Sequence, residues 1–484
     1  MGCGESKIEA TPENFSHFCL TFNWIEIVRL IHAQPRVVSL VKKAVENNWS
    51  SGLKEQDWNQ GAIDMVLSGR PFGKISSLEL CCHILEYLLA DGWCVVARSD
   101  MSRMIDNTTW FFQQRPEMKI AKGRSAATMF CVSMFGNDQL HLSKANMEVF
   151  KLVKTAIQKK YPRGNYKEEK NEDIDEYSLK LKGDPWISES SSGMEARAFY
   201  LQMLREFHEK GYYYYTANNT VTGRSDAVYY VHYGKGWEEE EGEAQFCMIS
   251  LNENDKMRLI DCPEKLIDSI RQILIRCRGN YGIQSEQEYA GTYEFKLRGE
   301  PWCADAQDVV GSRYTILKVI QAMRLEGWKL HFGLDMCRRM NDKAALVFKW
   351  AGKASGNLDF FCLAPGDVDR IRMIGAPKEI IDLLRDMLVK HYPQGISSET
   401  TDFYGAHEFK LSGLPFFGRN GTHELHMRSF FCFLLNRLDQ LGWEPIVSCD
   451  VSAKHVRTET GPDYVVDVFS WYFGRKEQPK KRKK

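Results

Sequence analysis

The stretch SGLPF (Ser412–Phe416) occurs in three further versions along this chain. They are SGRPF (Ser68–Phe72), KGDPW (Lys182–Trp186) and RGEPW (Arg298–Trp302). The four glycines are separated by 114, 116 and 114 residues. Self-similarity at a fixed period is typical of tandem structural repeats, so this phrase is the strongest indication of the fold.

Two further phrases recur with the same period. A glycine–aromatic pair follows an apolar helical pattern at Gly92-Trp93, Gly211-Tyr212, Gly327-Trp328 and Gly442-Trp443. A phenylalanine–cysteine pair ends in Cys19, Cys131, Cys247 and Cys362, which are 112, 116 and 115 residues apart. The markers predict an N-terminal tail (1–15), a basic C-terminal tail (476–484), and between them four repeats at residues 16–125, 126–240, 241–355 and 356–475.

The last unit shows the expected order of elements. Alternating or short apolar runs predict strands, and a 3.6-residue apolar period predicts helices. The predicted strands are 360–365, 368–374, 407–416, 444–450 and 464–473, and the predicted helices are 377–392 and 427–443. This order, roughly ββαβαββ, predicts an α+β fold with a mainly antiparallel sheet. The sequence leaves open whether neighbouring units exchange a hairpin, and whether they form a ring, an arc or separate beads.

Composition limits the classes of function. The 64 basic and 64 acidic residues give a formal net charge of zero, so no global field attracts nucleic acid. Neither a run of 18 apolar residues nor a secretory signal is present. The fourteen cysteines are therefore expected to be reduced. They include no CxxC pair, and the histidines show no metal-binding spacing, so we expect no metal and no cofactor.

One polar position recurs at the end of a predicted strand in every unit. It lies seven residues after the aromatic of the glycine–aromatic pair and is occupied by Asp100, Asn219, Asp335 and Asp450. A fourfold acidic position could contact a cation or ligand. Asp and Asn are also common turn formers and helix caps, and this structural interpretation is the favoured one. The repeated cysteines and the aromatic of each Gly-x-Pro phrase are expected in the core.

The first residues, MGCGESK, match the signal for N-myristoylation. Gly2 would accept the myristoyl chain once Met1 is removed, and Ser6 occupies the position that requires Ser or Thr. One myristoyl chain binds a membrane only weakly, so stable anchoring needs a second signal. Cys3 is the predicted site of S-palmitoylation.

The C-terminal tail supplies a third signal. Its basic residues are Lys480, Lys481, Arg482, Lys483 and Lys484. Basic clusters bind anionic cytoplasmic leaflets, at roughly 1 kcal/mol per residue near the surface. The same string could direct a protein to the nucleus, but the acylation motif on the same chain favours the membrane.

Several stretches resemble the raftlin (lipid-raft-linking) family. They are MGCG at the N-terminus, TWFFQQRP (Thr109–Pro116), LLNRLDQLGW (Leu434–Trp443) and VSAK (Val451–Lys454). The resemblance implies an acylated, raft-associated, non-enzymatic protein of the plasma membrane that acts in receptor signalling or uptake. Only Gly2 and Cys3 carry over as functional residues, and the regular four-unit layout differs from that family.

The sequence therefore predicts a lipid-anchored adaptor or scaffold on the cytoplasmic face of the plasma membrane. Its partners would be membrane lipids and proteins that the sequence does not identify. One alternative is a nuclear or nucleic-acid-associated repeat protein, although nucleic acid is disfavoured by the neutral charge. A third hypothesis is an enzyme acting on lipid or nucleotide with Asp100, Asp335 and Asp450 as site residues, which no catalytic motif supports.

Overall fold

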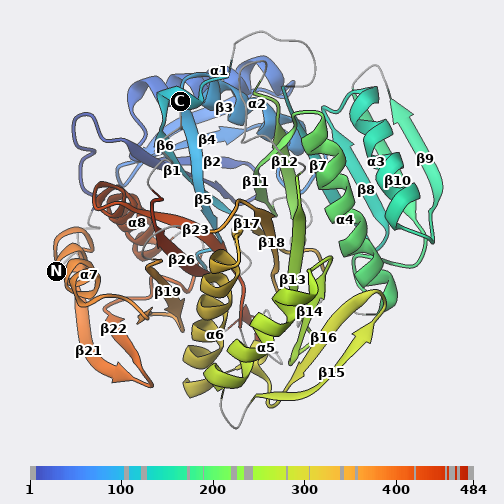
Figure 1. The fold of residues 1–484 in the computed structure, drawn as a ribbon. Helices are drawn as coiled ribbons and strands as arrows, with labels where there is room; N and C mark the ends of the chain where they lie inside the picture. Colours follow the sequence, from blue (N-terminus) through green and yellow to red (C-terminus); the bar gives the residue numbers. More distant parts are fainter. Residues whose placement is uncertain are drawn as a thin grey trace, which may run out of the picture.

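The computed structural model contains four copies of one α+β unit (Figure 1). It describes residues 7–102, 108–120, 128–171, 175–188, 190–219, 226–233, 244–278, 282–304, 306–337, 343–354, 358–418, 421–452, 455–456, 464–465 and 469–477. Within these ranges each unit forms one six-stranded antiparallel sheet and carries two helices. The prediction of four tandem repeats with mainly antiparallel sheets is confirmed.

The elements follow the same order in each repeat. Repeat 1 contains β1 (His17–Asn23), β2 (Ile27–Ile31), α1 (Pro35–Asn48), β3 (Leu53–Asn59), β4 (Ala62–Leu67), α2 (Ser77–Ala90), β5 (Trp93–Ser99) and β6 (Thr109–Gln114). Repeat 2 contains β7 (Met129–Phe135), β8 (Gln139–Ser143), α3 (Met147–Lys160), β9 (Asn165–Asn171), β10 (Glu176–Leu181), α4 (Ser191–Glu209), β11 (Tyr213–Asn218) and β12 (Ala227–Val231).

The second half of the chain repeats this pattern. Repeat 3 contains β13 (Phe246–Asn252), β14 (Lys256–Ile260), α5 (Glu264–Arg278), β15 (Ile283–Tyr289), β16 (Thr292–Leu297), α6 (Ala306–Leu325), β17 (Trp328–Leu334) and β18 (Ala345–Trp350). Repeat 4 contains β19 (Phe360–Gly366), β20 (Arg370–Ile374), α7 (Lys378–His391), β21 (Ile396–Phe403), β22 (Ala406–Leu411), α8 (Thr422–Gln440), β23 (Trp443–Cys449) and β26 (Ser470–Arg475). A short hairpin of β24 (His455–Val456) and β25 (Tyr464–Val465) lies between β23 and β26.

Each repeat is therefore ββαββαββ, with one strand more than the predicted ββαβαββ. The additional strand follows the first helix and forms one edge of the sheet, as β21 does in the order β21-β22-β20-β19-β26-β23. Its sequence ISSETTDF is exposed along most of its length. Because neither face of this strand is apolar, it lacks the alternation from which a half-buried strand is recognised.

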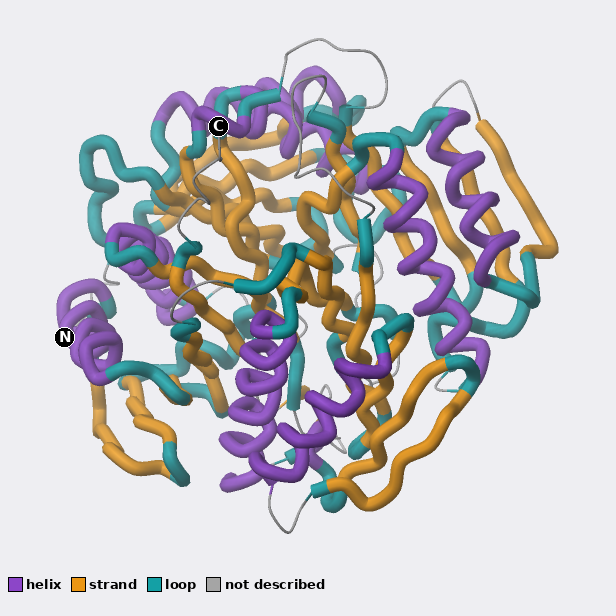
Figure 2. Tube along the Cα trace, in the orientation of Figure 1, coloured by secondary structure: helices purple, strands orange, loops and turns teal. Residues whose placement is uncertain are grey.

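The repeats close into a ring. The second helix of each repeat packs against the first strand of the next one, as α2 does on β7, and α8 of repeat 4 packs on β1 of repeat 1. Figure 1 shows the four sheets arranged around a common centre, and Figure 2 shows helices between and outside them. All six strands of each sheet come from one repeat. Neighbouring repeats are thus joined by packing, not by an exchanged hairpin.

Every hydrophobic core is shared by two neighbouring repeats. In the first core, Leu85 and Leu88 of α2 are buried together with Cys131 and Tyr229 of the second repeat's sheet. The second and third cores extend into the next sheet in the same way. The fourth core joins helix α8 to Cys19 of repeat 1 and so closes the ring. Removing one repeat would expose apolar surface on both of its neighbours.

The repeated markers lie in these cores as predicted. The aromatics of the Gly-x-Pro phrases, Phe72, Trp186, Trp302 and Phe416, are all buried, and so are the four repeated cysteines. The register of the third cysteine differs from the others, however. Strand pairing places Met248, and not Cys247, at the position of Cys19 and Cys131. Cys247 therefore faces the core of its own repeat, whereas Cys19 and Cys131 face the preceding one.

Buried arginines link three of the four junctions. They occupy equivalent places near the start of the second helix and donate to a hydroxyl group of the next repeat. The bonds are Arg197 Nε to Ser250 Oγ (2.8 Å), Arg313 Nε to Ser470 Oγ (2.7 Å) and Arg428 Nε to Thr109 Oγ1 (3.1 Å). Repeat 1 has Leu78 at this place. At its junction Ser133 Oγ, the counterpart of Ser250 Oγ, is buried without a hydrogen-bond partner among the described residues.

Candidate functional site

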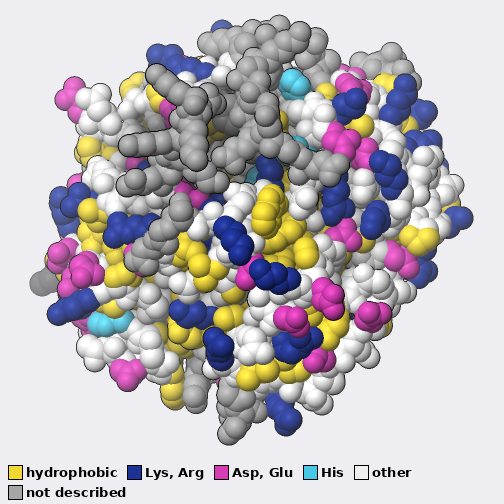
Figure 3. Space-filling model, in the orientation of Figure 1, with side chains coloured by type: hydrophobic (Ala, Val, Ile, Leu, Met, Phe, Trp, Pro, Cys, Tyr) yellow, Lys and Arg dark blue, Asp and Glu magenta, His cyan; other side chains and the backbone are white. Residues whose placement is uncertain are grey.

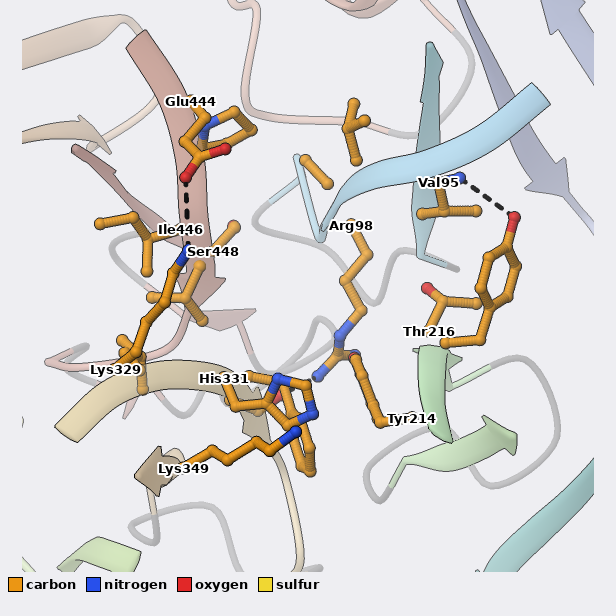
Figure 4. Close-up of a pocket in the computed structure, with 18 of the residues that line it drawn as sticks. Val95, Arg98, Tyr214, Thr216, Lys329, His331, Lys349, Glu444, Ile446 and Ser448 are labelled. Atoms are coloured by element: carbon orange, nitrogen blue, oxygen red, sulfur yellow. Dashed lines mark hydrogen bonds and ion pairs between the residues drawn. The ribbon is translucent and has the colours of Figure 1, made fainter. Parts of the chain in front are cut away.

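Four equivalent edge strands, β5, β11, β17 and β23, meet at the centre of the ring (Figure 1). β23 lies against both β5 and β17, and β11 lies against β5. A pocket of about 530 Å³ opens between them and is lined by residues from all four repeats. This volume is within the range of small-molecule sites, about 300–1,000 Å³. The pocket is the candidate functional site (Figure 4).

Each of these strands carries a β-bulge at the same place. The extra, unpaired residues are Val96, Tyr215, His331 and Ile446, and all four line the pocket. A bulge disrupts the hydrogen-bonding ladder and increases the local twist of a strand. The four bulges, one from each repeat, therefore surround the pocket.

Arg98 of β5 is the most deeply buried charged residue of the pocket wall. Its guanidinium donates to both carboxylate oxygens of Asp226 from repeat 2, at 2.7 and 2.6 Å, and to the carbonyl oxygen of Gly333 from repeat 3, at 2.7 Å. Burial alone would lower the pKa of Arg98, but the carboxylate of Asp226 raises it above its usual value. The pair thus joins three repeats through one ionised group.

Aromatic side chains form part of the wall. Tyr214 stacks on Phe332 with ring centroids 3.8 Å apart and planes at 14°. Burial raises the pKa of Tyr214 to about 12, although the positive charge of Arg98 opposes this shift. Tyr214 is therefore neutral at physiological pH. Figure 4 shows Arg98 pointing between Tyr214 and His331.

Basic side chains outnumber acidic ones around the pocket. Among the residues that the structure describes, its lining contains Arg98, Arg115, Lys329 and Lys349, and one carboxylate, that of Glu444. Lys329 Nζ lies 3.6 Å from a Glu444 oxygen, and Lys349 donates to His208 Nε2 at 3.0 Å. Basic and hydrophobic side chains lie side by side in the middle of this face of the molecule (Figure 3).

The polar residues that recur at strand ends lie between repeats and not in the pocket lining. Asn219 Nδ2 donates to Asp100 at 2.9 Å, and Lys343 Nζ donates to Asp450 at 3.0 Å. The carbonyl oxygen of Asp335 accepts a bond from the Asp226 amide at 2.9 Å. These contacts join neighbouring repeats to one another. No group of three or more potential metal ligands occurs among the described residues.

The predicted lipidation sites Gly2 and Cys3 and the basic residues 480–484 lie outside the described residues. The structure describes the chain from Lys7 onward, and this part bridges the seam, the interface between repeats 4 and 1. The Ile8 amide donates to the carbonyl oxygen of Gln60 at 2.9 Å, and Glu9 pairs with His391 of α7 at 2.6 Å. Ile8 is buried in the core that closes the ring.

Reasoning from sequence did not identify the pocket residues. Arg98, Lys329, Lys349 and Glu444 vary between repeats, so the internal repetition gives them no emphasis. One signal was available: in three of the four units the strand after the glycine–aromatic pair is mostly uncharged yet carries one different charged residue, namely Arg98, Lys329 or Glu444. Only closure of the ring brings these residues together.

One domain-family model matches the chain four times, over residues 16–113, 128–231, 245–349 and 359–473. This chain belongs to that family of repeat domains. Each match spans the six strands and two helices of one ring unit. No curated protein and no solved structure matches the chain.

Proposed function

We propose that this chain is a peripheral membrane adaptor, held on the cytoplasmic face of the plasma membrane by acyl groups on Gly2 and Cys3. The observation that carries the proposal is the short path from the acylation motif to the ring. Ile8, six residues after Gly2, is already buried at the seam. A fully extended chain spans about 3.5 Å per residue, so a tether of this length would hold the seam within about 20 Å of the bilayer.

The surroundings of this entry point suit a membrane interface. Trp58 lies two residues before Gln60 and is 68% exposed. Val389 lies two residues before His391 and is 71% exposed. Exposed tryptophan partitions favourably into the headgroup region of a bilayer. A short tether would bring both side chains to the lipid surface, where they would add to the binding free energy of the acyl chains.

Anchoring also draws on two further contributions. A palmitoyl chain on Cys3 would stabilise binding by about 0.8 kcal/mol per buried methylene group, which makes release slow. The basic residues 480–484 would add electrostatic attraction to anionic lipids. Among the described residues, no helix is long and apolar enough to cross a membrane. The resemblance to the raftlin family supports the same assignment.

An adaptor role accounts for the ring. Four related domains joined in one ring present several surfaces at once, and concentration at a membrane multiplies weak contacts. Receptor signalling or uptake is the setting that the raftlin resemblance suggests. The alternative of a nuclear protein depends on the basic tail alone.

Membrane flotation from animal cells tests the proposal. The variants are Gly2→Ala, Cys3→Ser and the matched control Gly4→Ala, which leaves the acceptor glycine in place. We expect wild type and Gly4→Ala to float, Gly2→Ala to become soluble, and Cys3→Ser to float only in part. If Gly2→Ala floats like wild type, the tether is wrong. If wild type is nuclear and replacing Lys480–Lys484 by glutamine moves it to the cytoplasm, the alternative holds.

A further inference from the structure

Three exposed apolar side chains surround the point at which the basic C-terminal tail leaves the ring. Leu325 ends α6 and is 56% exposed, Trp350 ends β18 and is 41% exposed, and Leu441 follows α8 and is 37% exposed. We call these three residues the apolar rim. Single exposed apolar residues are common on protein surfaces, whereas a group of them marks an interaction surface.

Two contacts place Trp350 beside the end of α6. The amide of Ala351 donates to the carbonyl oxygen of Gly327 at 2.9 Å. A Cβ atom at Gly327 would lie 2.5 Å from the Trp350 ring, so the ring covers this glycine. Because Gly327 lies two residues after Leu325, the two rim side chains are neighbours on the surface.

The start of the C-terminal tail joins this pair to Leu441. Arg324, the residue before the first rim leucine, donates to both carboxylate oxygens of Glu477 at 2.6 Å. The amide of Lys476 donates to the carbonyl oxygen of Gly442, which follows Leu441, at 2.9 Å. The tail therefore leaves the ring between the ends of α6 and α8.

The fold itself does not require apolar residues at these places. The two positions before the glycine of the glycine–aromatic pair, which contain the rim leucines in repeats 3 and 4, are Ala90-Asp91 in repeat 1 and Glu209-Lys210 in repeat 2. Trp350 pairs with the tryptophan that follows this glycine, and the equivalent partner is Gln114 in repeat 1 and Arg475 in repeat 4. The exposed apolar rim is thus a property of one side of the ring.

The charges around the rim favour an anionic surface as its partner. The carboxylates of Glu326, Asp439 and Glu477 each lie in an ion pair, with Lys265, Lys476 and Arg324 respectively. The five basic residues 480–484 begin three residues after Glu477, so they can reach at most about 10–25 Å from it. Apolar side chains beside a basic cluster are typical of proteins that bind anionic lipid, whereas a nucleic acid would gain nothing from exposed leucines.

We propose that the apolar rim and the basic tail together dock on an anionic lipid bilayer, with Leu325, Trp350 and Leu441 in its headgroup region. The inference rests on the proposed function in one respect, that the partner is a membrane. It does not depend on acylation, because it uses only residues of the ring and the tail. It is therefore testable on the full chain without acyl groups.

Cosedimentation of the unacylated full chain with lipid vesicles tests the proposal. The probes are vesicles of phosphatidylserine with phosphatidylcholine, and vesicles of phosphatidylcholine alone. We expect binding to the anionic vesicles that is at least about tenfold tighter than to the neutral ones and that weakens as salt is added. If the chain binds neither kind of vesicle, or binds both equally, the proposal is wrong.

Variants then locate the surface. Leu325→Ser with Leu441→Ser should weaken binding to anionic vesicles about tenfold, because less apolar area is buried in the bilayer. The matched control, Ile275→Ser with Leu414→Ser, replaces two exposed apolar side chains outside the rim and should leave binding unchanged. Equal effects of the two double variants would exclude the rim as the docking surface.

A gain in affinity separates docking from misfolding. Leu325→Trp places a residue that partitions into the headgroup region at the rim and should tighten binding about threefold, whereas no gain would count against insertion. The outcome is also separable from that of the tether. If Gly2→Ala becomes soluble in cells but the vesicle test fails, the tether stands and this surface is wrong. If Gly2→Ala floats like wild type and the vesicle test succeeds, the surface stands and the tether is wrong.

Discussion

Replacing Arg98 with methionine removes the ion pair that joins three repeats. Arg98 is 8% exposed, and its partner Asp226 is 3% exposed. The substitution keeps most of the buried side-chain volume. It removes the hydrogen bonds that the Asp226 carboxylate accepts from Arg98 and leaves the one that it accepts from the Asp335 amide, at 2.7 Å. Removing one partner of a buried ion pair typically costs about 3–5 kcal/mol.

The expected change in melting temperature depends on how the ring unfolds. Unfolding entropy is about 2.1 cal/mol/K per residue, so the 484-residue chain has roughly 1 kcal/mol/K in all. If the ring melts in one transition, a loss of about 3–5 kcal/mol lowers Tm by about 3–5 °C. If a single repeat of about 115 residues melted alone, the same loss would lower its Tm by about 12–20 °C. Because neighbouring repeats share every core, we expect the smaller shift.

Differential scanning calorimetry measures this shift directly. The matched variant is Arg98→Met with Asp226→Asn, which removes both charges and retains an acceptor for the Asp335 amide. The double variant should be more stable than Arg98→Met alone, since no uncompensated buried charge remains. An unchanged Tm for Arg98→Met, or a double variant that is less stable than the single one, would show that the ion pair does not stabilise the ring.

Three further predictions concern the junctions, the seam and the membrane face. Ser133→Ala should leave the free energy of unfolding unchanged or raise it by up to about 1 kcal/mol, because its buried hydroxyl has no partner among the described residues. Ser250→Ala should lower the free energy of unfolding by about 1–3 kcal/mol, because its hydroxyl accepts the bond from Arg197. Chemical denaturation measures both changes. Burial, together with the nearby charge of another histidine, lowers the pKa of His32 to about 4. As the pH falls, His32 is therefore protonated in the unfolded chain before it is protonated in the folded one. Between pH 6.5 and 4, wild type should lose up to about 3 kcal/mol more stability than His32→Gln. Equal losses would contradict this. Trp58→Ser should reduce flotation of the acylated protein. The control is Trp24→Ser, which replaces an exposed tryptophan at the opposite end of the same sheet and should not reduce flotation. Equal effects would exclude Trp58 from the membrane face.

The repeat could be read from the sequence because it has a local backbone cause. Each Gly-x-Pro phrase follows a strand with a turn whose glycine has a positive φ, 82° at Gly413 and 90° at Gly183. The same geometry therefore demands the same residue four times. The polar edge strands were missed because their side chains are exposed on both faces. Letter matching also misplaced Cys247 by one residue, since strand register depends on pairing and not on local identity.

The ring and its pocket could not be predicted for a different reason. Helix α8 packs on β1, about 400 residues away in the chain, and no local pattern marks that contact. The residues that line the pocket, Arg98 and Lys329 among them, differ between repeats, so they stand outside the periodic signal. The pocket is lined by positions at which the repeats diverge, whereas the sequence pattern emphasises positions at which they agree.

The mass of the N-terminal peptide from animal cells would decide whether this chain is held at a membrane through its first residues. We expect a peptide that lacks Met1 and carries a fourteen-carbon acyl chain on Gly2, with a second acyl chain on Cys3 in a hydroxylamine-sensitive fraction. A peptide that begins at Met1, or that begins at Gly2 with a free or acetylated amine, would rule out the myristoyl tether.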